Sequence, residues 1–269
     1  MQNPVFLLQN MLKEEGWNMN VKDKVIAVTG GAGGIGSAIV RTLCEKDAVV
    51  WILDIRGDAG EEKAAAFRAE GWQVYSVQMD VGVEADWKRA IDTIYAQCGR
   101  LDSVVNLAAI NIRKSVLEMN QEEWSHMMDV NTGSIFLSCK YAIPIMKEQS
   151  TGGTIINISS VCGLIGHMYT TEAYTASKGA VTLLTRAVAA RYGHLNIRSN
   201  SIHPCTVDTP FVAAVMADPV RKQQRIDEVP LGRLGTVEDV ANAVLYLASE
   251  EGSFINGCAL TVDGGTTCY

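Results

Sequence analysis

Seven short apolar runs constrain the fold of this 269-residue chain more than any other feature. They are rich in valine and isoleucine, and amphipathic helical patterns separate most of them. Apolar strands of this kind suit a parallel sheet buried on both faces, because right-handed crossovers place helices on each side. We therefore predict a doubly wound α/β fold with a sheet of about seven parallel strands. The runs cover residues 24–28, 48–53, 73–77, 103–107, 154–158, 197–202 and 258–262.

A glycine-rich turn follows the first run and precedes a helical stretch. Residues 29–36 read T-G-G-A-G-G-I-G, with Gly30, Gly34 and Gly36 in a T-G-x-x-x-G-x-G pattern. Glycines permit a tight turn and let the backbone approach a pyrophosphate, which then rests against the positive end of the helix. Glycine also punctuates ordinary loops. Placed after the first strand of an alternating β/α chain, this turn predicts a Rossmann-type dinucleotide site.

Asp54 closes the second apolar run, 18 residues after Gly36. This separation is close to the roughly 20 residues expected for an acid that binds the adenosine ribose. A carboxylate there accepts bonds from the 2′-hydroxyl and repels a 2′-phosphate, so it favours NAD over NADP. Arg56 argues mildly for the phosphate, and a helix-capping role for Asp54 is the alternative. No lysine or arginine lies inside the glycine turn, and we predict NAD.

Tyr174 and Lys178 lie four residues apart, a spacing that places two side chains on one face of a helix. A free tyrosine has a pKa of about 10 and exchanges protons poorly at neutral pH. One cation about 4 Å away stabilises a phenolate by roughly 4 kcal/mol, enough to bring that pKa near 7. An ordinary exposed pair is the usual explanation of a bare Tyr-x-x-x-Lys. A serine pair just upstream, Ser159 and Ser160, favours a catalytic one.

The composition limits the kinds of molecule that this chain is expected to bind. The formal net charge of −7 disfavours nucleic acid, and no apolar run approaches the roughly 20 residues of a membrane helix. Seven scattered cysteines without a C-x-x-C pair suit reduced thiols in the cytoplasm, and four dispersed histidines support no metal site. No linker or repeat divides residues 22–269, which we predict to form one domain. Residues 1–21 are expected to form an N-terminal extension. It has three possible explanations: a frayed tail, translation from a start codon upstream of an alternative start at Met19, or a short helix that packs on a neighbouring subunit.

Together these features resemble the short-chain dehydrogenase/reductase family from about residue 22 onward. Asn106 and Ala108 match two positions of the family's Asn-Asn-Ala-Gly, and residues 156–160 match the strand that ends in its catalytic serine. Further matches are Asp80-Val81, Asn131, the segment 200–210, Pro230-Leu231-Gly232-Arg233 and Val262-Asp263-Gly264-Gly265.

The resemblance implies roles for individual residues. Tyr174 would be the general acid/base, Lys178 would lower its pKa and bind the nicotinamide ribose, and Ser160 would orient the substrate oxygen. Asn131 would hold a water that links Lys178 to solvent. The dinucleotide would contact Gly30, Gly34, Ile35, Gly36, Asp54, Ile55, Asp80, Val81, Asn106, Ala108, Tyr174, Lys178, Pro204, Val207 and Thr209.

Three departures from the family pattern are visible. The spacing from Ser160 to Tyr174 is one residue longer than usual, so Ser159 is a possible substitute for Ser160. Cys205 replaces a glycine after Pro204 and is expected to narrow the substrate site. Ala109 replaces another glycine and adds a methyl group near the cofactor.

The substrate site is expected between Asn111, the loop 162–171 and the segment 205–230. Candidate substrate residues are Asn111, Cys162, His167 and Phe211, although an ordinary loop residue is the favoured explanation of His167. The resemblance implies an oxidoreductase that acts on a secondary alcohol or ketone as a homotetramer, with a dimer as the fallback. Two alternatives stay open: an NADPH-dependent ketone or 3-oxoacyl reductase, and a catalytically silent dinucleotide-binding regulator.

Overall fold

The computed structural model describes residues 19–269, apart from the side chains of Phe211, Ala214 and Val215, and contains a seven-stranded parallel sheet. Its strand order is β3-β2-β1-β4-β5-β6-β7. The predicted runs and the strands agree within one or two residues at most ends. The strands are β1 (Val25–Thr29), β2 (Val49–Asp54), β3 (Val74–Gln78), β4 (Ser103–Asn106), β5 (Gly153–Ile158), β6 (Ile197–Pro204) and β7 (Ala259–Val262).

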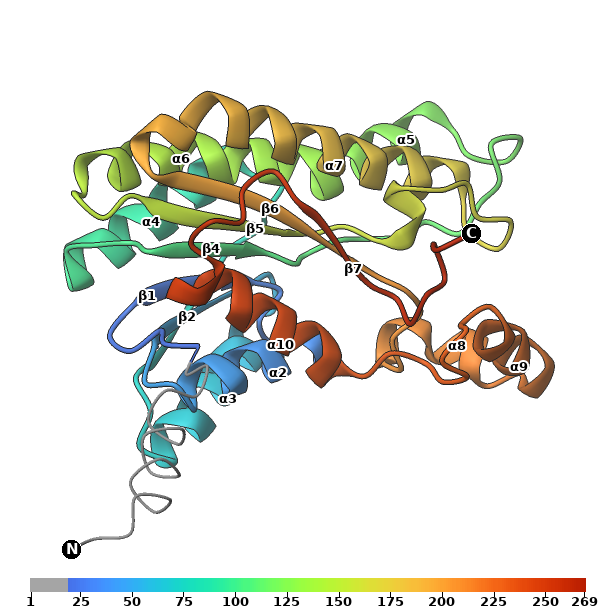
Figure 1. The fold of residues 1–269 in the computed structure, drawn as a ribbon, viewed down its shortest axis with the longest axis horizontal. Helices are drawn as coiled ribbons and strands as arrows, with labels where there is room; N and C mark the ends of the chain where they lie inside the picture. The colour runs from blue at the N-terminus through green and yellow to red at the C-terminus, as the bar shows by residue number, and fades with distance from the viewer. Residues whose placement is uncertain (1–18) are drawn as a thin grey trace, which may run out of the picture.

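Helices cover both faces of the sheet (Figure 1). One layer contains α2 (Gly34–Cys44), α3 (Gly57–Ala69) and α10 (Val237–Ala248), and the other contains α4 (Glu84–Cys98), α6 (Ser134–Glu148) and α7 (Glu172–Tyr192). Two apolar cores result, one on each side of the sheet. The predicted doubly wound fold is therefore confirmed. The side chains of β1 alternate between the cores: Ile26 and Val28 belong to one, Val25 and Ala27 to the other.

The helical segment 121–148 is not one continuous α-helix. It is divided into α5 (Gln121–Met128), a π-helical turn (Asp129–Gly133) and α6. Asn120 caps α5 through its own side chain and Glu123, in a reciprocal capping box. Single π-helical turns inside α-helices are frequent at functional sites, and this one contains Asn131.

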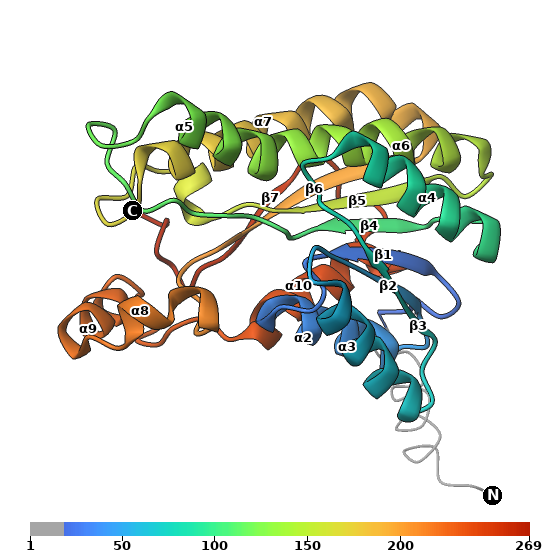
Figure 2. The same cartoon turned by 180° about the vertical axis from the view of Figure 1, so that it is seen from behind.

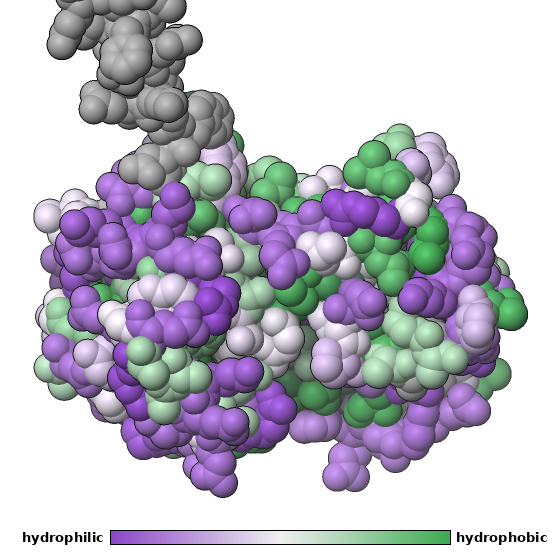
Figure 3. Space-filling model, turned by 90° about the horizontal axis from the view of Figure 1, so that it is seen from below, coloured by the Kyte–Doolittle hydropathy of each residue, from purple (hydrophilic) through white to green (hydrophobic). Residues whose placement is uncertain are grey.

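Two short helices stand apart from the layered body. Figures 1 and 2 show α8 (Ala213–Met216) and α9 (Pro219–Asp227) beyond the end of β6, separate from both layers. Asp218 caps α9 by accepting bonds from two backbone N–H groups, and Pro219 begins the helix. Seen from below, the molecule is hollowed near its middle, between the part that carries α10 and the part that carries α8 and α9 (Figure 3).

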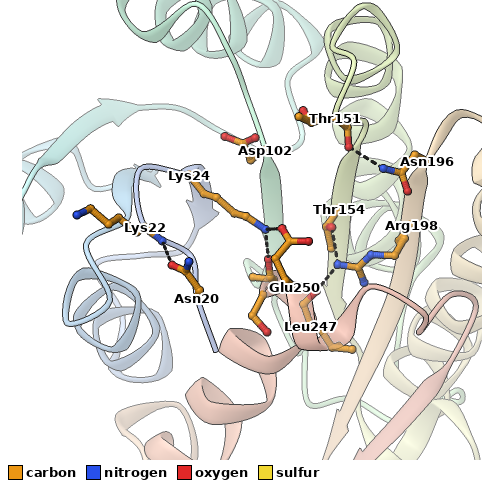
Figure 4. A network of polar contacts seen from close by, with 12 residues as sticks. Asn20, Lys22, Lys24, Asp102, Thr151, Thr154, Asn196, Arg198, Leu247 and Glu250 are labelled. Atoms are coloured by element: carbon orange, nitrogen blue, oxygen red, sulfur yellow. Dashed lines mark hydrogen bonds and ion pairs between the residues drawn. The ribbon is translucent and has the colours of Figure 1, made fainter. Parts of the chain in front are cut away.

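A polar network lies at the amino ends of the strands (Figure 4). Lys24, just before β1, forms an ion pair of 2.6 Å with Glu250 after α10. The buried Arg198 of β6 donates to Thr154 of β5 at 2.8 Å and to the carbonyl of Leu247 at 2.7 Å. These contacts connect the amino ends of β1, β5 and β6 to the end of α10. The carboxyl ends of the strands lie at the other side of the sheet and line the cavity described below.

Among the described residues, none of the helices combines the length and apolar character needed to cross a bilayer. All seven cysteines fall within this range, and none of them forms a disulfide.

Candidate active site

A cavity of about 1120 Å³ lies at the carboxyl ends of the strands. It extends around the point where the strand order reverses, between β1 and β4, which is where open α/β sheets bind ligands. Its walls bring together the glycine turn, the ends of β2 to β6, the loop before α7, and α9. Segments separated by up to two hundred residues in sequence therefore meet in one site.

The glycine turn forms one end of this cavity. Gly30 has a φ of +68°, a left-handed conformation that favours glycine. A Cβ on Gly36 would lie 2.2 Å from the carbonyl oxygen of Gly30, so only glycine permits this approach. No side chain caps the start of α2. Its first N–H groups are left to bind an anion, so this cradle fits the pyrophosphate of a dinucleotide.

Asp54 lies beside the glycine turn, where β2 ends. Its Oδ2 accepts a bond of 3.1 Å from the N–H of Ala32, and its Oδ1 accepts one of 3.0 Å from the N–H of Arg56. The Arg56 guanidinium, 3.4 Å from the same carboxylate, is largely exposed. The acid and its neighbouring cation are thus paired at the end of the cavity where an adenosine ribose would lie.

Tyr174 and Lys178 lie in the first two turns of α7, and both line the cavity. The side chain of Thr171 accepts a bond from the N–H of Tyr174 and so caps the helix. The Lys178 ammonium is 5.6 Å from the centre of the Tyr174 ring and donates to the carbonyl of Ile158 at 2.8 Å. The carbonyl at the end of β5 therefore holds the lysine beneath the phenol.

Burial controls the protonation of this pair. It lowers the pKa of Lys178 to about 8 from its ordinary value of 10.5. It also raises the pKa of Tyr174, mainly because a buried phenolate loses its hydration, although a hydrogen bond from Ser160 opposes the rise. The direction is opposite to the one expected from the Tyr-Lys spacing alone, since that expectation omitted the cost of burial.

The two serines have different surroundings. The hydroxyl of Ser159 donates to the carbonyl of Lys178 at 3.0 Å and is buried. The hydroxyl of Ser160 accepts from the N–H of Cys162 at 3.2 Å and interacts with Tyr174. Of the two serines, Ser160 is therefore the one whose hydroxyl contacts the tyrosine.

Asn131 and Asn106 lie behind the site rather than on its wall. Both N–H bonds of the Asn131 amide are used, one to the carbonyl of Ile110 and one to the hydroxyl of Ser177. Its oxygen accepts from the N–H of Ile110, so Asn131 fastens the segment after β4 to α7. The side chain of Asn106 is buried and donates to Asn157, and the prediction that this residue contacts the cofactor stays a prediction.

Most of the other predicted residues line the cavity. These are Gly30, Gly34, Ile35, Gly36, Asp54, Ile55, Asp80, Val81, Ala108, Asn111, Ser160, Cys162, His167, Tyr174, Lys178, Pro204, Val207 and Thr209. The side chain of the predicted substrate residue Phe211 lies outside the described part of the structure. Within residues 19–269, no group of three His, Cys, Asp or Glu side chains is arranged to hold a metal ion.

Comparisons with known proteins identify the family. A family profile described as Enoyl-(Acyl carrier protein) reductase matches residues 30–267. The chain is 38% identical to cyclopentanol dehydrogenase of Comamonas sp. (strain NCIMB 9872), over 92% of this chain and 98% of that protein. It belongs to the short-chain dehydrogenase/reductase family.

Two further relatives broaden the picture. The chain is 36% identical to trans-4-hydroxycyclohexanecarboxylate dehydrogenase of Sinomonas cyclohexanicum, over 92% of this chain and 94% of that protein. The crystal structure of a gluconate 5-dehydrogenase from Burkholderia cenocepacia J2315, in complex with NADP and tartrate, superposes with a TM-score of 0.89 at 30% identity. It covers 94% of this chain and 98% of that one. The chain is thus an oxidoreductase of this family, which interconverts a secondary alcohol and its ketone.

His203 is a residue of the site that sequence reasoning missed. It is fully buried in β6, where its Nδ1 lies 2.8 Å from the carbonyl oxygen of Ser160 and its Nε2 2.8 Å from the hydroxyl of Ser201. Burial lowers the pKa of His203, which favours the neutral ring. A carbonyl only accepts, so Nδ1 carries the proton and Nε2 accepts from Ser201. The one available signal was a histidine directly before Pro204 at a strand end.

We expect His203→Gln to reduce kcat by about tenfold, because loss of one buried hydrogen bond costs on the order of 1 kcal/mol or more and releases the Ser160 backbone. His203→Asn should retain most of kcat, since the asparagine amide can occupy the position of Nδ1. Both variants should bind cofactor normally. Steady-state kinetics with cofactor titration would check this, and equal losses in the two variants would contradict a positioning role.

Lys178 predicts a pH dependence of stability. Between about pH 8 and 10.5 the unfolded chain holds the lysine proton and the folded chain has released it, so stability increases as pH rises. Below about pH 8 both states are protonated and the cost of the buried charge is fully present. Relative to Lys178→Met, the wild type should gain about 2.5 kcal/mol of unfolding free energy from pH 7 to 10. Urea unfolding at several pH values measures this difference; a constant difference would contradict it.

Proposed function

We propose that this chain is an NAD-dependent dehydrogenase that oxidises a secondary alcohol, or reduces its ketone, with Tyr174 as the general acid/base. One observation carries the proposal. Tyr174, Lys178 and Ser160 line the same cavity as a glycine cradle shaped for a pyrophosphate. A single ligand lying along this cavity would bring its reactive ring to the tyrosine.

In this proposal Tyr174 transfers a proton and Ser160 orients the substrate oxygen. When bound, the dinucleotide supplies the hydride acceptor or donor. In alcohol oxidation the Tyr174 phenolate takes the hydroxyl proton as the carbinol hydride leaves. Ser160 donates to the same oxygen and orients it. We expect the Lys178 ammonium, 5.6 Å from the centre of the Tyr174 ring, to favour the phenolate, because an opposite charge nearby stabilises the charged form. The relay through Asn131 stays a prediction.

The preference for NAD rests on Asp54. Its carboxylate is nearly buried beside the glycine turn, where it would accept bonds from ribose hydroxyls and repel a phosphate. Arg56 is held by the same carboxylate, which reduces its availability for a phosphate. The relative of known structure contains NADP, so the NADPH-dependent reductase is the alternative that a direct comparison of the two cofactors must exclude.

Relatives suggest a range of substrates. Their names include cyclopentanol, a neutral cyclic alcohol, and trans-4-hydroxycyclohexanecarboxylate, a cyclic alcohol that bears an acid. A cyclic or aliphatic secondary alcohol is the class that we propose. The silent regulator is disfavoured because the tyrosine, lysine and serine are all present.

We also propose that the protein assembles through α6 and α7 as a homotetramer, or failing that a dimer. Phe136 on α6 and Leu183 on α7 are 55% and 65% exposed, so each of the two helices has apolar surface that a second subunit could cover. Light scattering at micromolar concentration tests the assembly, and a stable monomer would exclude it.

Seven unpaired cysteines favour a reducing compartment such as the cytoplasm.

The test of function is a panel of secondary alcohols and ketones with NAD and with NADP, followed at the reduced-nicotinamide absorbance band. We expect turnover of cyclopentanol or cyclohexanol with NAD. Tight binding of NADH with no turnover of any alcohol or ketone would favour the silent regulator instead.

A further inference from the structure

A cationic cluster closes the substrate side of the cavity. Arg225 of α9 is only 8% exposed, and it lines the cavity together with His167, Tyr169 and Glu228. Its guanidinium lies 4.1 Å from the centre of the Tyr169 ring, a cation–π arrangement that fixes the plane of the group. The cluster therefore joins the loop before α7 to α9, two segments that are far apart in sequence.

The hydrogen bonds of Arg225 leave much of the group unused. Its Nη1 donates to both carboxylate oxygens of Glu228, at 3.2 and 2.9 Å, and lies 3.4 Å from Nε2 of His167. Among the side chains that the structure describes, none accepts a hydrogen bond from Nε or Nη2 of Arg225. Neither atom is among the buried side-chain atoms that lack a partner in the described part of the chain, so water or a ligand in the cavity can reach them.

The free donors form a specific recognition surface. Nε and Nη2 make up the edge of a guanidinium that binds a carboxylate through two parallel hydrogen bonds. Arg221 lies one helical turn earlier on α9 and lines the same cavity, so a second cation adjoins the first. Glu228 is the carboxylate that contacts Arg225 directly, and Glu172 also lines the cavity, where it accepts a bond from the N–H of Val116.

We propose that the substrate carries a carboxylate, or a similar oxyanion, which Arg225 binds through Nε and Nη2 while the carbinol carbon lies at Tyr174. The substrate class is then a hydroxy acid and its keto acid, with the anion remote from the reacting carbon. This inference rests on the proposed function and adds the substrate class. Glu228 holds Arg225 in place and at the same time competes with the substrate anion for it.

The alternative is that Arg225 and Glu228 form only a structural latch between the loop and α9. The two explanations predict different effects of one substitution on the affinity for an anion. Glu228→Gln keeps a hydrogen-bonding partner of similar shape but removes the competing negative charge. It should strengthen anion binding at a recognition site, and it should not do so if the pair is merely a latch.

The experiment is calorimetric titration of the full-length protein with cyclohexanecarboxylate and with the neutral cyclohexanecarboxamide, with and without NADH. We expect the wild type to bind the carboxylate about 10- to 100-fold more tightly than the amide. Arg225→Met should abolish this ratio, and Glu228→Gln should increase it several-fold. The control Lys222→Met should change it by less than about threefold, because Lys222 is exposed on the same helix and does not line the cavity.

Two outcomes would overturn the inference: equal binding of the two probes by the wild type, or carboxylate binding in Glu228→Gln that is unchanged or weaker. Oxidation of cyclohexanol separates this inference from the proposed function. Turnover of the neutral alcohol without a preference for the carboxylate would remove the anion site alone. Arg225-dependent carboxylate binding without turnover of any alcohol would remove the proposed function alone.

Discussion

Tyr174→Phe should reduce kcat by about three to four orders of magnitude, in line with the upper part of the range for removing a general acid/base. The substitution deletes only the phenolic oxygen, so the ring still fills its place above Lys178. Cofactor affinity should change by less than about threefold. Steady-state kinetics with one alcohol, together with a fluorescence titration of NADH, would measure both quantities.

Three companion variants sharpen this prediction. Ser160→Ala should reduce kcat more than Ser159→Ala, because the Ser159 hydroxyl bonds the carbonyl of Lys178 rather than the tyrosine. Lys178→Ala should reduce both turnover and cofactor affinity, since the ammonium lies at the tyrosine and lines the dinucleotide cavity. Near-normal turnover in Tyr174→Phe would exclude the role proposed for this residue.

Asp54→Ser should shift the ratio of kcat/KM for NAD and NADP toward NADP by about 100-fold, or on the order of 3 kcal/mol. The carboxylate makes charge-assisted bonds worth about 1.5–3 kcal/mol each to ribose hydroxyls, and it repels a 2′-phosphate. Removing it weakens NAD binding and relieves that repulsion together. It also releases the Arg56 guanidinium from its ion pair, so this cation becomes available to the phosphate.

The measurement compares the ratio in wild type and variant with one common substrate. Asp58→Ser is the matched control, because Asp58 is an exposed aspartate in the first turn of α3 and does not line the cavity. It should leave the ratio within about twofold. A wild type that already prefers NADP would mean that Arg56 outweighs Asp54.

Local sequence patterns were sufficient to predict the fold and to bring together the residues that we propose to react. A strand buried on both faces must be apolar throughout, so the seven runs marked the strands to within a few residues. The glycine turn was equally readable, because the close approach of Gly36 to Gly30 excludes every side chain. Tyr174 and Lys178 were paired correctly by helical spacing, a relation that needs no knowledge of the rest of the chain.

Relations between distant segments required the tertiary structure. The pKa of Tyr174 rises because the surrounding elements remove water from it, a cost that the spacing to Lys178 does not contain. His203 meets the backbone of Ser160 only because β5 and β6 are neighbours in the sheet. Arg225 meets His167 and Tyr169 only because α9 lies against the loop before α7. The sequence by itself thus determined the strands, the glycine cradle and the pairing of Tyr174 with Lys178, since these depend on contacts within a few residues or on burial of a whole segment. The tertiary structure decided the pKa of Tyr174, the contact of His203 with the Ser160 backbone, and the place of Arg225 on the cavity wall. Each of these depends on which distant groups meet around one cavity.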